Sequence, residues 1–332
     1  MGSGVRVFVV TILSALTVTG CGGDHSGHGA AGPPPSGPVG PPQAFPSAQG
    51  KTVADLLRGL GPGPRLASSV SALEPGRDRI AYALFDRARR QIGDTPSALY
   101  VADANGRNLR GPFHASYESL AVTSRYRSAT VANDPDSAQS IYVSEAEFPA
   151  PGSYTIVGVV QLDQRLVGSA PTTVTVRSHA TPPDVGQLAP RVHTPTTATV
   201  QGDLRMIDTR SPPDSMHSDD LADVLGRRPV MLLFASPALC HSRTCGPVVD
   251  ELAELKGKRG RDAAFIHMEI YKDNNPQSGQ RDQVRAYRLP SQPWLFAIDR
   301  SGHVAARIEG AFSEDEANSA LDAAVAGAAA RR

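Results

Sequence analysis

Two cysteines, Cys240 and Cys245, are the residues whose types and spacing most directly imply chemistry. Thiols this close in sequence can close a disulfide, exchange it with another thiol, or bind a soft metal ion. His241 and Arg243 lie between them, and positive charge there would favour the reactive thiolate form of either cysteine. The pair is therefore the first candidate for an active site.

The residues on either side of the pair predict a buried strand followed by an amphipathic helix. Residues 229–234 are continuously apolar, as in a short strand covered on both faces. After the pair, apolar residues recur at helical spacing, and Pro247 suits a first helical turn because its missing N–H leaves no helical hydrogen bond unmade. Both cysteines are thus predicted at or near a helix N-terminus, where free backbone N–H groups and the helix dipole favour a thiolate.

The N-terminus combines Arg6, an apolar run over residues 7–18, and small residues immediately before Cys21. This pattern resembles a bacterial lipoprotein signal with its lipobox. The resemblance implies that residues 1–20 are removed, that Cys21 is lipidated, and that the protein is anchored at the cell membrane on its extracytoplasmic face. An ordinary secretory signal or a membrane-spanning anchor are the alternatives, and the run is short for a span of about 20 residues.

Residues 21–63 are predicted to form a tether, because their first thirty positions are dominated by Gly, Pro, Ser and Ala and hold little that could form a core. Asp24, His25 and His28 fall within it. Since no fixed geometry would hold these three side chains together, we interpret them as linker residues rather than as a metal site.

Residues 64–178 show short segments rich in Val, Ile, Tyr and Thr, separated by turn residues at intervals typical of an all-β sandwich. The pattern weakly resembles an immunoglobulin-like domain, although no cysteine pair bridges the strands. No catalytic cluster is evident, so a binding or spacer role is expected. The predicted strands are 78–85, 98–101, 140–148, 154–162 and 172–177.

Residues 184–332 alternate between predicted strands and helices, which favours a mixed sheet covered by helices on both faces. The strands are expected at 229–234, 263–270, 294–299 and 303–309, and the helices at 219–225, 247–256, 279–288 and from 313 onward. The chain is therefore predicted to be multidomain, with an N-terminal all-β domain and a C-terminal α/β domain.

This element order, with a cysteine pair after the first central strand and Gln292-Pro293-Trp294 opening a later strand, resembles the thioredoxin superfamily. The resemblance implies that Pro293 follows a cis peptide bond facing the cysteines, and that the backbone at Gln292 pairs with a bound substrate. A cis bond before proline is only modestly disfavoured. The implied site is thus Cys240, Cys245 and Pro293 for catalysis, with Gln292 and Trp294 binding substrate.

Several positions depart from that family. Its members carry C-x-x-C preceded by tryptophan, whereas this chain has C-x4-C preceded by Leu239, and Leu233 stands where they bury a carboxylate. Thiol–disulfide exchange is therefore the leading prediction. A non-catalytic envelope binding protein with a structural disulfide, peroxide chemistry, and copper handling similar to the Sco family remain alternatives, with His217 and His267 as possible ligands in the last case.

Charge excludes some classes of partner. Lys and Arg together number 33, as do Asp and Glu, so no net basic field points to nucleic acid. Extracytoplasmic proteins or thiols, and the membrane through the lipid anchor, are the expected partners, and no cofactor or resident metal is predicted.

Overall fold

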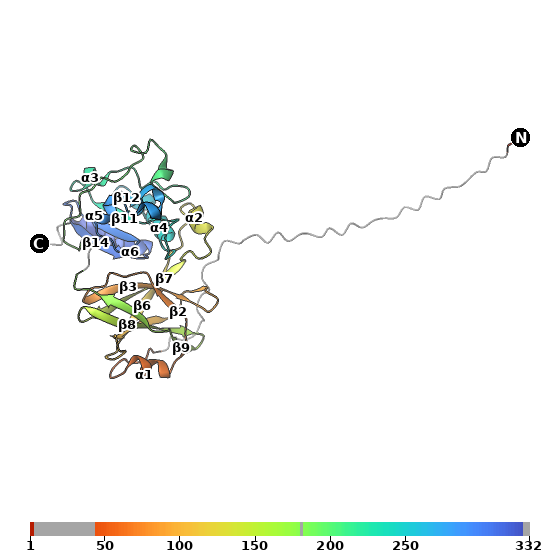
Figure 1. Cartoon of the computed structure of the whole chain (residues 1–332), viewed down its shortest axis with the longest axis vertical. Coiled ribbons are helices and arrows are strands. Elements are labelled where there is room, and N and C mark those ends of the chain that lie inside the picture. Colours follow the sequence, from red (N-terminus) through yellow and green to blue (C-terminus); the bar gives the residue numbers. More distant parts are fainter. Residues whose placement is uncertain (3–43, 180–181, 328–332) are drawn as a thin grey trace.

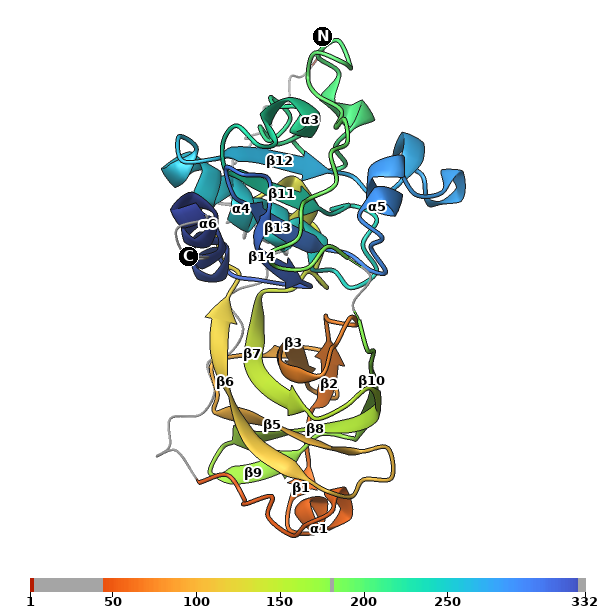
Figure 2. The same ribbon diagram turned by 90° about the vertical axis from the view of Figure 1, so that its left-hand side faces the viewer.

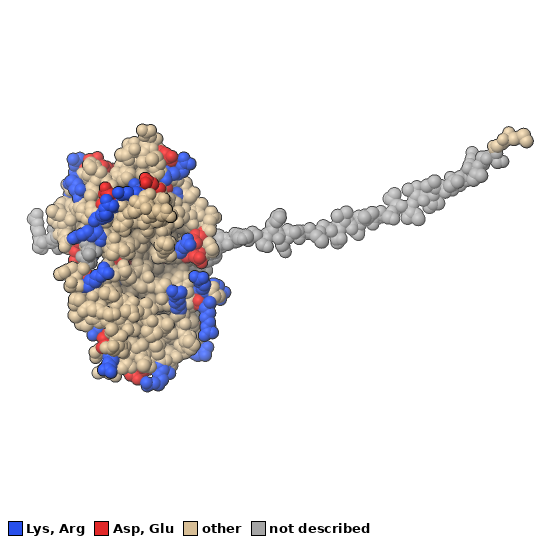
Figure 3. All heavy atoms as spheres, viewed as in Figure 1, with Lys and Arg blue, Asp and Glu red and all other residues tan. Residues whose placement is uncertain are grey.

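The computed structural model describes residues 1–2, 44–179 and 182–327 as two stacked domains joined near residue 180 (Figures 1 and 2). Cys21 and most of the predicted signal lie outside the described residues, so the lipidation site stays a prediction. Within the described part of the chain, none of the helices has the length and apolar character needed to cross a bilayer. On the face seen in Figure 3, basic and acidic side chains are interspersed over both domains.

The N-terminal domain is a ten-stranded sheet that curls on itself, in agreement with the predicted all-β class. Its strands alternate buried and exposed residues where one face meets the core and the other meets solvent, as along Ser144–Phe148. The strands are β1 (Gly61–Pro62), β2 (Arg65–Ser68), β3 (Gly76–Phe85), β4 (Gln91–Ile92), β5 (Ser97–Asp103), β6 (Arg110–Ser119), β7 (Ser140–Phe148), β8 (Gly152–Leu162), β9 (Arg165–Gly168) and β10 (Thr172–Val176).

All five predicted strands are present, whereas β6 and the short strands β1, β2, β4 and β9 were not predicted. The main hydrogen-bonded path runs β1-β9-β8-β5-β6-β7-β3-β2 without a break. The strands therefore join in one sheet rather than in two separate ones, and the immunoglobulin-like topology is not confirmed.

Residues 44–63, predicted to end the tether, instead pack on the β domain. Helix α1 (Val53–Arg58) begins with a capping box between Thr52 and Asp55, and Val53 and Leu56 are buried. The Tyr100 hydroxyl donates a hydrogen bond to the Pro46 carbonyl at 2.7 Å. The end of the tether, predicted at residue 63, is thus too late, because the short apolar face of α1 lies within a Gly- and Pro-rich part of the sequence.

The C-terminal domain holds a four-stranded mixed sheet in the order β12-β11-β13-β14. Strands β11 and β12 are parallel, while β13 runs antiparallel to β11 and β14 antiparallel to β13. Each predicted strand and helix is present within a few residues of its predicted bounds. The elements are η1 (Leu204–Met206), α3 (Leu221–Val224), β11 (Val230–Phe234), α4 (Cys245–Arg259), β12 (Ala264–Met268), η2 (Lys272–Asn274), η3 (Pro276–Ser278), α5 (Asp282–Ala286), β13 (Trp294–Ile298), β14 (Val304–Glu309) and α6 (Glu314–Ala326).

Strand β11 lies in the middle of this sheet and sends alternate side chains to two apolar layers. Met231 and Leu233 belong to the cluster that includes apolar residues of α4 and α6. Val230, Leu232 and Phe234 belong to the opposite cluster, with residues of α3 and α5. Helices therefore cover both faces, as the alternating elements predicted.

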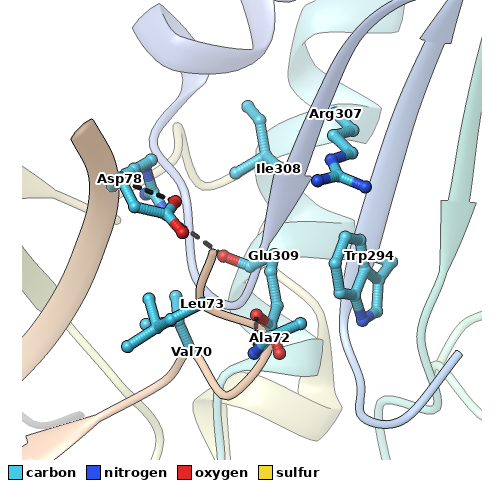
Figure 4. Close-up of a pocket in the computed structure, with 9 residues that line it drawn as sticks. Val70, Ala72, Leu73, Asp78, Trp294, Arg307, Ile308 and Glu309 are labelled. Atoms are coloured by element: carbon cyan, nitrogen blue, oxygen red, sulfur yellow. Dashed lines mark hydrogen bonds between the residues drawn. The ribbon is translucent and has the colours of Figure 1, made fainter. Parts of the chain in front are cut away.

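The two domains share buried surface. One apolar cluster contains residues of both, among them Ile80 from β3 and Phe312 just before α6. A cavity of about 70 Å³ lies between them, bordered by Leu73 and Asp78 on one side and by Trp294 and Glu309 on the other (Figure 4). The Glu309 carboxylate accepts hydrogen bonds from the backbone N–H groups of Ser71 and Ala72, at 3.0 and 2.8 Å.

Arg79 is the most heavily bonded cation of this interface. Its guanidinium makes a two-pronged ion pair with Glu316 of α6, at 2.6 and 2.7 Å. It also donates to the carbonyls of Glu309 and Ala311, at 3.1 and 2.7 Å. Because the side chains of both ionic partners are about four-fifths buried, loss of either leaves the other poorly compensated.

We therefore predict that Arg79→Met lowers the free energy of unfolding by about 3 kcal/mol, the lower end of the range for removing one partner of a buried ion pair, because both side chains keep about a fifth of their exposure. Urea unfolding measures the change. Arg58→Met is the matched control, because the Arg58–Asp55 pair is exposed and its loss should cost well under about 1 kcal/mol. Equal effects of the two substitutions would contradict this account of the interface.

Helix α4 buries three acidic residues that its amphipathic pattern would place in solvent: Asp250, Glu251 and Glu254. Burial raises the pKa of Glu251 to about 8, although the backbone N–H of Glu314 favours the charged form. One oxygen of the Glu251 carboxyl has no hydrogen-bond partner within the described residues. Its charged form is therefore expensive in the folded protein.

The pH dependence of stability follows from this shift. Below the ordinary glutamate pKa of 4.5 the carboxyl is neutral in both states, and between 4.5 and about 8 the unfolded chain loses the proton that the folded chain keeps. The contribution of Glu251 to the free energy of unfolding therefore falls as the pH rises from 4.5 to about 8. Glu251→Gln should be close to neutral at pH 4 and should stabilise by roughly 1–3 kcal/mol at pH 8.5. Denaturant unfolding at both pH values tests this, with exposed Glu145→Gln as a control expected to show no such gain.

Candidate active site

The two cysteines form a disulfide between the loop that follows β11 and the first residue of α4. Their Cα atoms are 5.9 Å apart, within the ordinary range for a disulfide. Cys245 is the first residue of the helix and is fully buried, whereas Cys240 retains 5 % exposure. The prediction that both thiols lie at a helix N-terminus is confirmed for Cys245, and Cys240 lies in the loop before it.

The loop between the cysteines is exposed and tightly turned. His241, Ser242 and Arg243 are exposed, and Arg243 adopts a left-handed backbone conformation with φ of 58°. The Ser242 hydroxyl lies 3.2 Å from the sulfur of Cys240 and 2.8 Å from the Thr244 hydroxyl. The loop therefore presents polar groups next to the more exposed of the two sulfurs.

Gln292 and Pro293 lie beside the disulfide. The peptide bond between them is cis, as expected. The side-chain oxygen of Gln292 lies 3.5 Å from the sulfur of Cys245 and accepts a hydrogen bond from the backbone N–H of Ser236 at 2.9 Å. Within the described residues, the backbone N–H and C=O of Gln292 have no hydrogen-bond partner.

Trp294, predicted to bind substrate, points elsewhere. Its side chain is 2 % exposed and lines the interdomain cavity of Figure 4. The indole N–H donates to the Ser291 hydroxyl at 3.0 Å, and its ring stacks on Phe296. Among the described residues no hydrogen bond or ring contact joins Trp294 to either cysteine. The structure thus brings together Cys240, Cys245, Gln292 and Pro293 and leaves Trp294 in the domain interface.

The segment between β6 and β7 of the β domain reaches the loop between the two cysteines. It contains the short helix α2 (Ala129–Ala132). The backbone N–H of Ala138 donates to the Arg243 carbonyl at 3.0 Å, and the Arg243 guanidinium lies 3.3 Å from the Asp134 carboxylate. Gly246 permits the close approach, because a Cβ there would lie 2.9 Å from Val131. The β domain therefore forms one border of the site.

A buried carboxyl supports the loop from behind. Glu269, directly after β12, accepts hydrogen bonds from the hydroxyls of Ser236 and Thr209. Burial raises its pKa, against the charge of His267 and these hydrogen bonds. Glu269 follows β12, whereas position 233 lies on β11, so the residue at position 233 gives no indication of this carboxyl. Leu233 is a core residue.

His217 and His267, the possible copper ligands, contact aspartates rather than the cysteines. His267 lies 2.8 Å from Asp214, and His217 lies 3.2 Å from Asp208. Neither aspartate was singled out from the sequence, because they lie in an irregular segment without a recognisable motif. Asp24, His25 and His28 lie outside the described residues.

Comparisons with known proteins add the following. No protein-family model and no curated protein matches the chain. Among solved structures, one similar chain is assigned as the thiol:disulfide interchange protein DsbE from Chlorobium tepidum, with 18% identity, a TM-score of 0.31, and coverage of 43% of this chain and 99% of that one. Another is a thioredoxin-family thiol:disulfide interchange protein from Chlorobium tepidum TLS, with 17% identity, a TM-score of 0.30, and coverage of 44% and 99%. The C-terminal domain is a mixed sheet between two helical layers, with a cysteine pair after the central strand and a cis peptide bond before Pro293, which agrees with the arrangement that the resemblance in the sequence implies.

Proposed function

We propose that this chain is an extracytoplasmic, lipid-anchored protein that carries out thiol–disulfide exchange through Cys240 and Cys245. The observation that carries the proposal is the position of the disulfide, which spans the start of α4 and contacts the Gln292–Pro293 loop. A helix N-terminus lowers the free energy of a thiolate, and a nearby unpaired backbone can hold a partner in extended form.

The exchange proceeds by two sulfur displacements. When the protein acts as an oxidant, a partner thiolate attacks the sulfur of Cys240, and Cys245 leaves as a thiolate. A second partner thiolate then attacks the partner's sulfur in the mixed disulfide, so that the partner is oxidised and both cysteines are reduced. In the reverse direction the Cys240 thiolate attacks a partner disulfide, and Cys245 resolves the intermediate. Either direction moves two electrons.

The residues around the sulfurs suit these roles. Cys240 is the more exposed sulfur, whereas Cys245 lies fully buried against Gln292. The free backbone of Gln292 would pair with the partner, and the polar loop at His241–Arg243 would contact it from the opposite side. The substrates proposed are proteins or small thiols outside the cytoplasm.

One observation favours the alternative of a structural disulfide in a non-catalytic binding protein. Both sulfurs have low exposure, and the loop that carries them is held by Ala138 and Asp134 of the β domain. Such a clamp would restrict access by a partner. The reduction potential separates the two functions.

We predict that the Cys240–Cys245 couple has a reduction potential above about −300 mV, because inert structural disulfides usually lie below that value. Equilibration of the full chain with redox buffers, followed by alkylation and mass measurement, gives the potential. A value clearly below −300 mV would support the structural disulfide and contradict the exchange function.

The same function predicts unequal behaviour of the two cysteines. Cys245→Ser should accumulate a mixed disulfide with a partner, because the resolving thiol is gone while the attacking thiol remains. Cys240→Ser should accumulate much less, because the remaining sulfur is buried. Non-reducing electrophoresis of the two matched variants measures this. Trapping in Cys240→Ser alone would reverse the roles, and trapping in neither variant would argue against exchange.

Lipid anchoring has its own test. Cys21→Ser should shift the protein from the membrane to the soluble fraction or leave an unprocessed precursor, because the acylated residue is absent. Fractionation and intact mass of the two proteins show the difference. Unchanged processing and membrane partition would contradict the lipobox assignment.

A further inference from the structure

Four buried side chains that the exchange chemistry does not use meet in one cluster. They are Asp208, Asp214, His217 and His267, and the side chain of each is at most 1 % exposed. One potential ligand atom from each residue lies within 4.8 Å of the corresponding atoms of the other three. Two carboxylates and two imidazoles thus face a common point inside the C-terminal domain.

The backbone brings these residues together from two segments. Asp208, Asp214 and His217 lie in the irregular chain before α3, and His267 lies on β12. The backbone N–H of His267 donates to the Met216 carbonyl at 2.9 Å, so the irregular segment runs beside the strand. The cluster therefore fastens a chain segment without regular structure to the edge of the sheet.

Charge balance within the cluster is incomplete. Two carboxylates are almost fully removed from water, and among the described residues neither forms an ion pair with a lysine or an arginine. Buried carboxylates require compensating positive charge. Arg210, the nearest arginine in sequence, is paired with Asp250 instead.

The imidazoles compensate this charge poorly. As an imidazolium, His267 can donate to Asp214 and to the Ala235 carbonyl, which supplies one positive charge. His217 differs, because its Nδ1 is buried without a hydrogen-bond partner in the described part of the chain. An imidazolium at His217 would leave a charged N–H buried and unpaired, so the second positive charge is missing.

The spacing of the ligand atoms fits a small divalent cation. The Nε2 atom of His217 lies 3.2 and 3.5 Å from one oxygen each of Asp208 and Asp214, and Nδ1 of His267 lies 3.8 and 2.8 Å from the other oxygen of each. A four-ligand set uses one oxygen of each carboxylate, and its atoms lie within 4.8 Å of one another. Four ligands placed tetrahedrally at about 2.0–2.1 Å from Zn²⁺ would be separated by roughly 3.3–3.4 Å. Of the observed nitrogen–oxygen distances, 3.2 and 2.8 Å are shorter than this value, and 3.5 and 3.8 Å are longer.

Hydrogen bonds with backbone groups orient three of the four side chains. Asp208 accepts from the backbone N–H groups of Arg210 and Asp214, at 2.8 and 2.7 Å. Asp214 accepts from the N–H of Met216, and Nε2 of His267 lies 3.0 Å from the Ala235 carbonyl, which leaves Nδ1 directed to the cluster. Metal-binding histidines and carboxylates usually have outer partners of this kind.

We propose that Asp208, Asp214, His217 and His267 bind one zinc ion in a closed, four-coordinate structural site. Zinc suits two nitrogen and two oxygen ligands in tetrahedral geometry, and its two charges balance the two carboxylates. All four positions are taken by protein side chains, so the ion stabilises the fold and does not activate water. The site excludes Cys240 and Cys245, and it is independent of the proposed exchange function.

The test uses the untagged full chain carrying Cys21→Ser, Cys240→Ser, Cys245→Ser, His25→Ala and His28→Ala, so that neither thiols nor linker histidines bind metal. After removal of metal by a chelator, one equivalent of Zn²⁺ should be retained through gel filtration and should raise the Tm. Co²⁺ in its place should give the intense visible absorption of four-coordinate cobalt. The same measurements on the chain with its cysteines reduced should show no sulfur-to-cobalt absorption in the near ultraviolet at one equivalent.

Single substitutions then locate the site. His267→Gln and Asp214→Asn, made in the same background, should weaken zinc binding at least about 100-fold, beyond the usual effect of removing an outer partner. His193→Gln is the matched control, because His193 forms a similar histidine–aspartate contact with Asp220 but is exposed. It should leave binding unchanged.

Three results would overturn the proposal. The first is a folded protein, by circular dichroism, that retains neither Zn²⁺ nor Co²⁺ at stoichiometric level, in which case the cluster is a histidine–aspartate hydrogen-bond network. The second is cobalt absorption from thiolate ligands in the chain with cysteines. The third is equal loss of binding in His193→Gln. If the cluster variants fail to fold, the cobalt spectrum of the variant that lacks only the cysteines and the linker histidines still tests whether the cluster binds metal.

Discussion

Complete burial of strand β11 is the constraint on which the C-terminal domain depends. Its five side chains alternate between the layer of α4 and α6 and the layer of α3 and α5, so neither face can reach water. Its neighbours β12 and β13 occupy both edges, which satisfies the backbone hydrogen bonds. A strand enclosed in this way can end only where the chain leaves the core. The disulfide loop begins at that point.

Buried charge, rather than apolar contact alone, connects helix α4 to the β domain. Asp250 of α4 accepts from Arg210 at 2.8 Å and from the backbone N–H of Ser128 at 2.8 Å. Burial raises the pKa of Asp250, and these partners oppose the shift by stabilising its charged form. Since each group would be costly to bury alone, the three positions depend on one another. The segment between β6 and β7 is thus part of the surroundings of the disulfide and not only a connection within the β domain.

The sequence predicted the parts of this structure that follow from periodicity and local chemistry. Continuous apolar residues at 229–234 identified the central strand, and Pro247 after the cysteine pair identified the helix start. The resemblance to thioredoxins placed Gln292–Pro293 beside the cysteines. The prediction omits strand β6, in which Gly111–Pro112 interrupts the pattern near the start and only Phe113, Ala115 and Tyr117 alternate with polar residues. Helix α1 was hidden by the glycine- and proline-rich composition around it.

Contacts between distant segments had no comparable signal. Nothing local to Trp294 indicates that its indole turns toward Ser291 and the interdomain cavity rather than toward the cysteines. Nor does a spacing of six residues between Asp208 and Asp214 resemble a metal motif, because the fourth member of that cluster comes from a strand fifty residues away. Such sites are defined by the packing of the irregular segment on β12, which depends on the finished sheet.

The disulfide loop, residues 236–245, and the aspartate–histidine cluster are connected through one stretch of backbone. The Ala235 carbonyl lies 3.0 Å from His267 Nε2, and the next residue, Ser236, donates through its N–H to Gln292 and through its hydroxyl to Glu269. The other end of the loop is held by α4, whose first residue is Cys245. Opening the disulfide therefore removes a bond inside the loop, while these hydrogen bonds at Ala235 and Ser236 remain. Movement on reduction should accordingly be confined to the residues between Ser236 and Cys245.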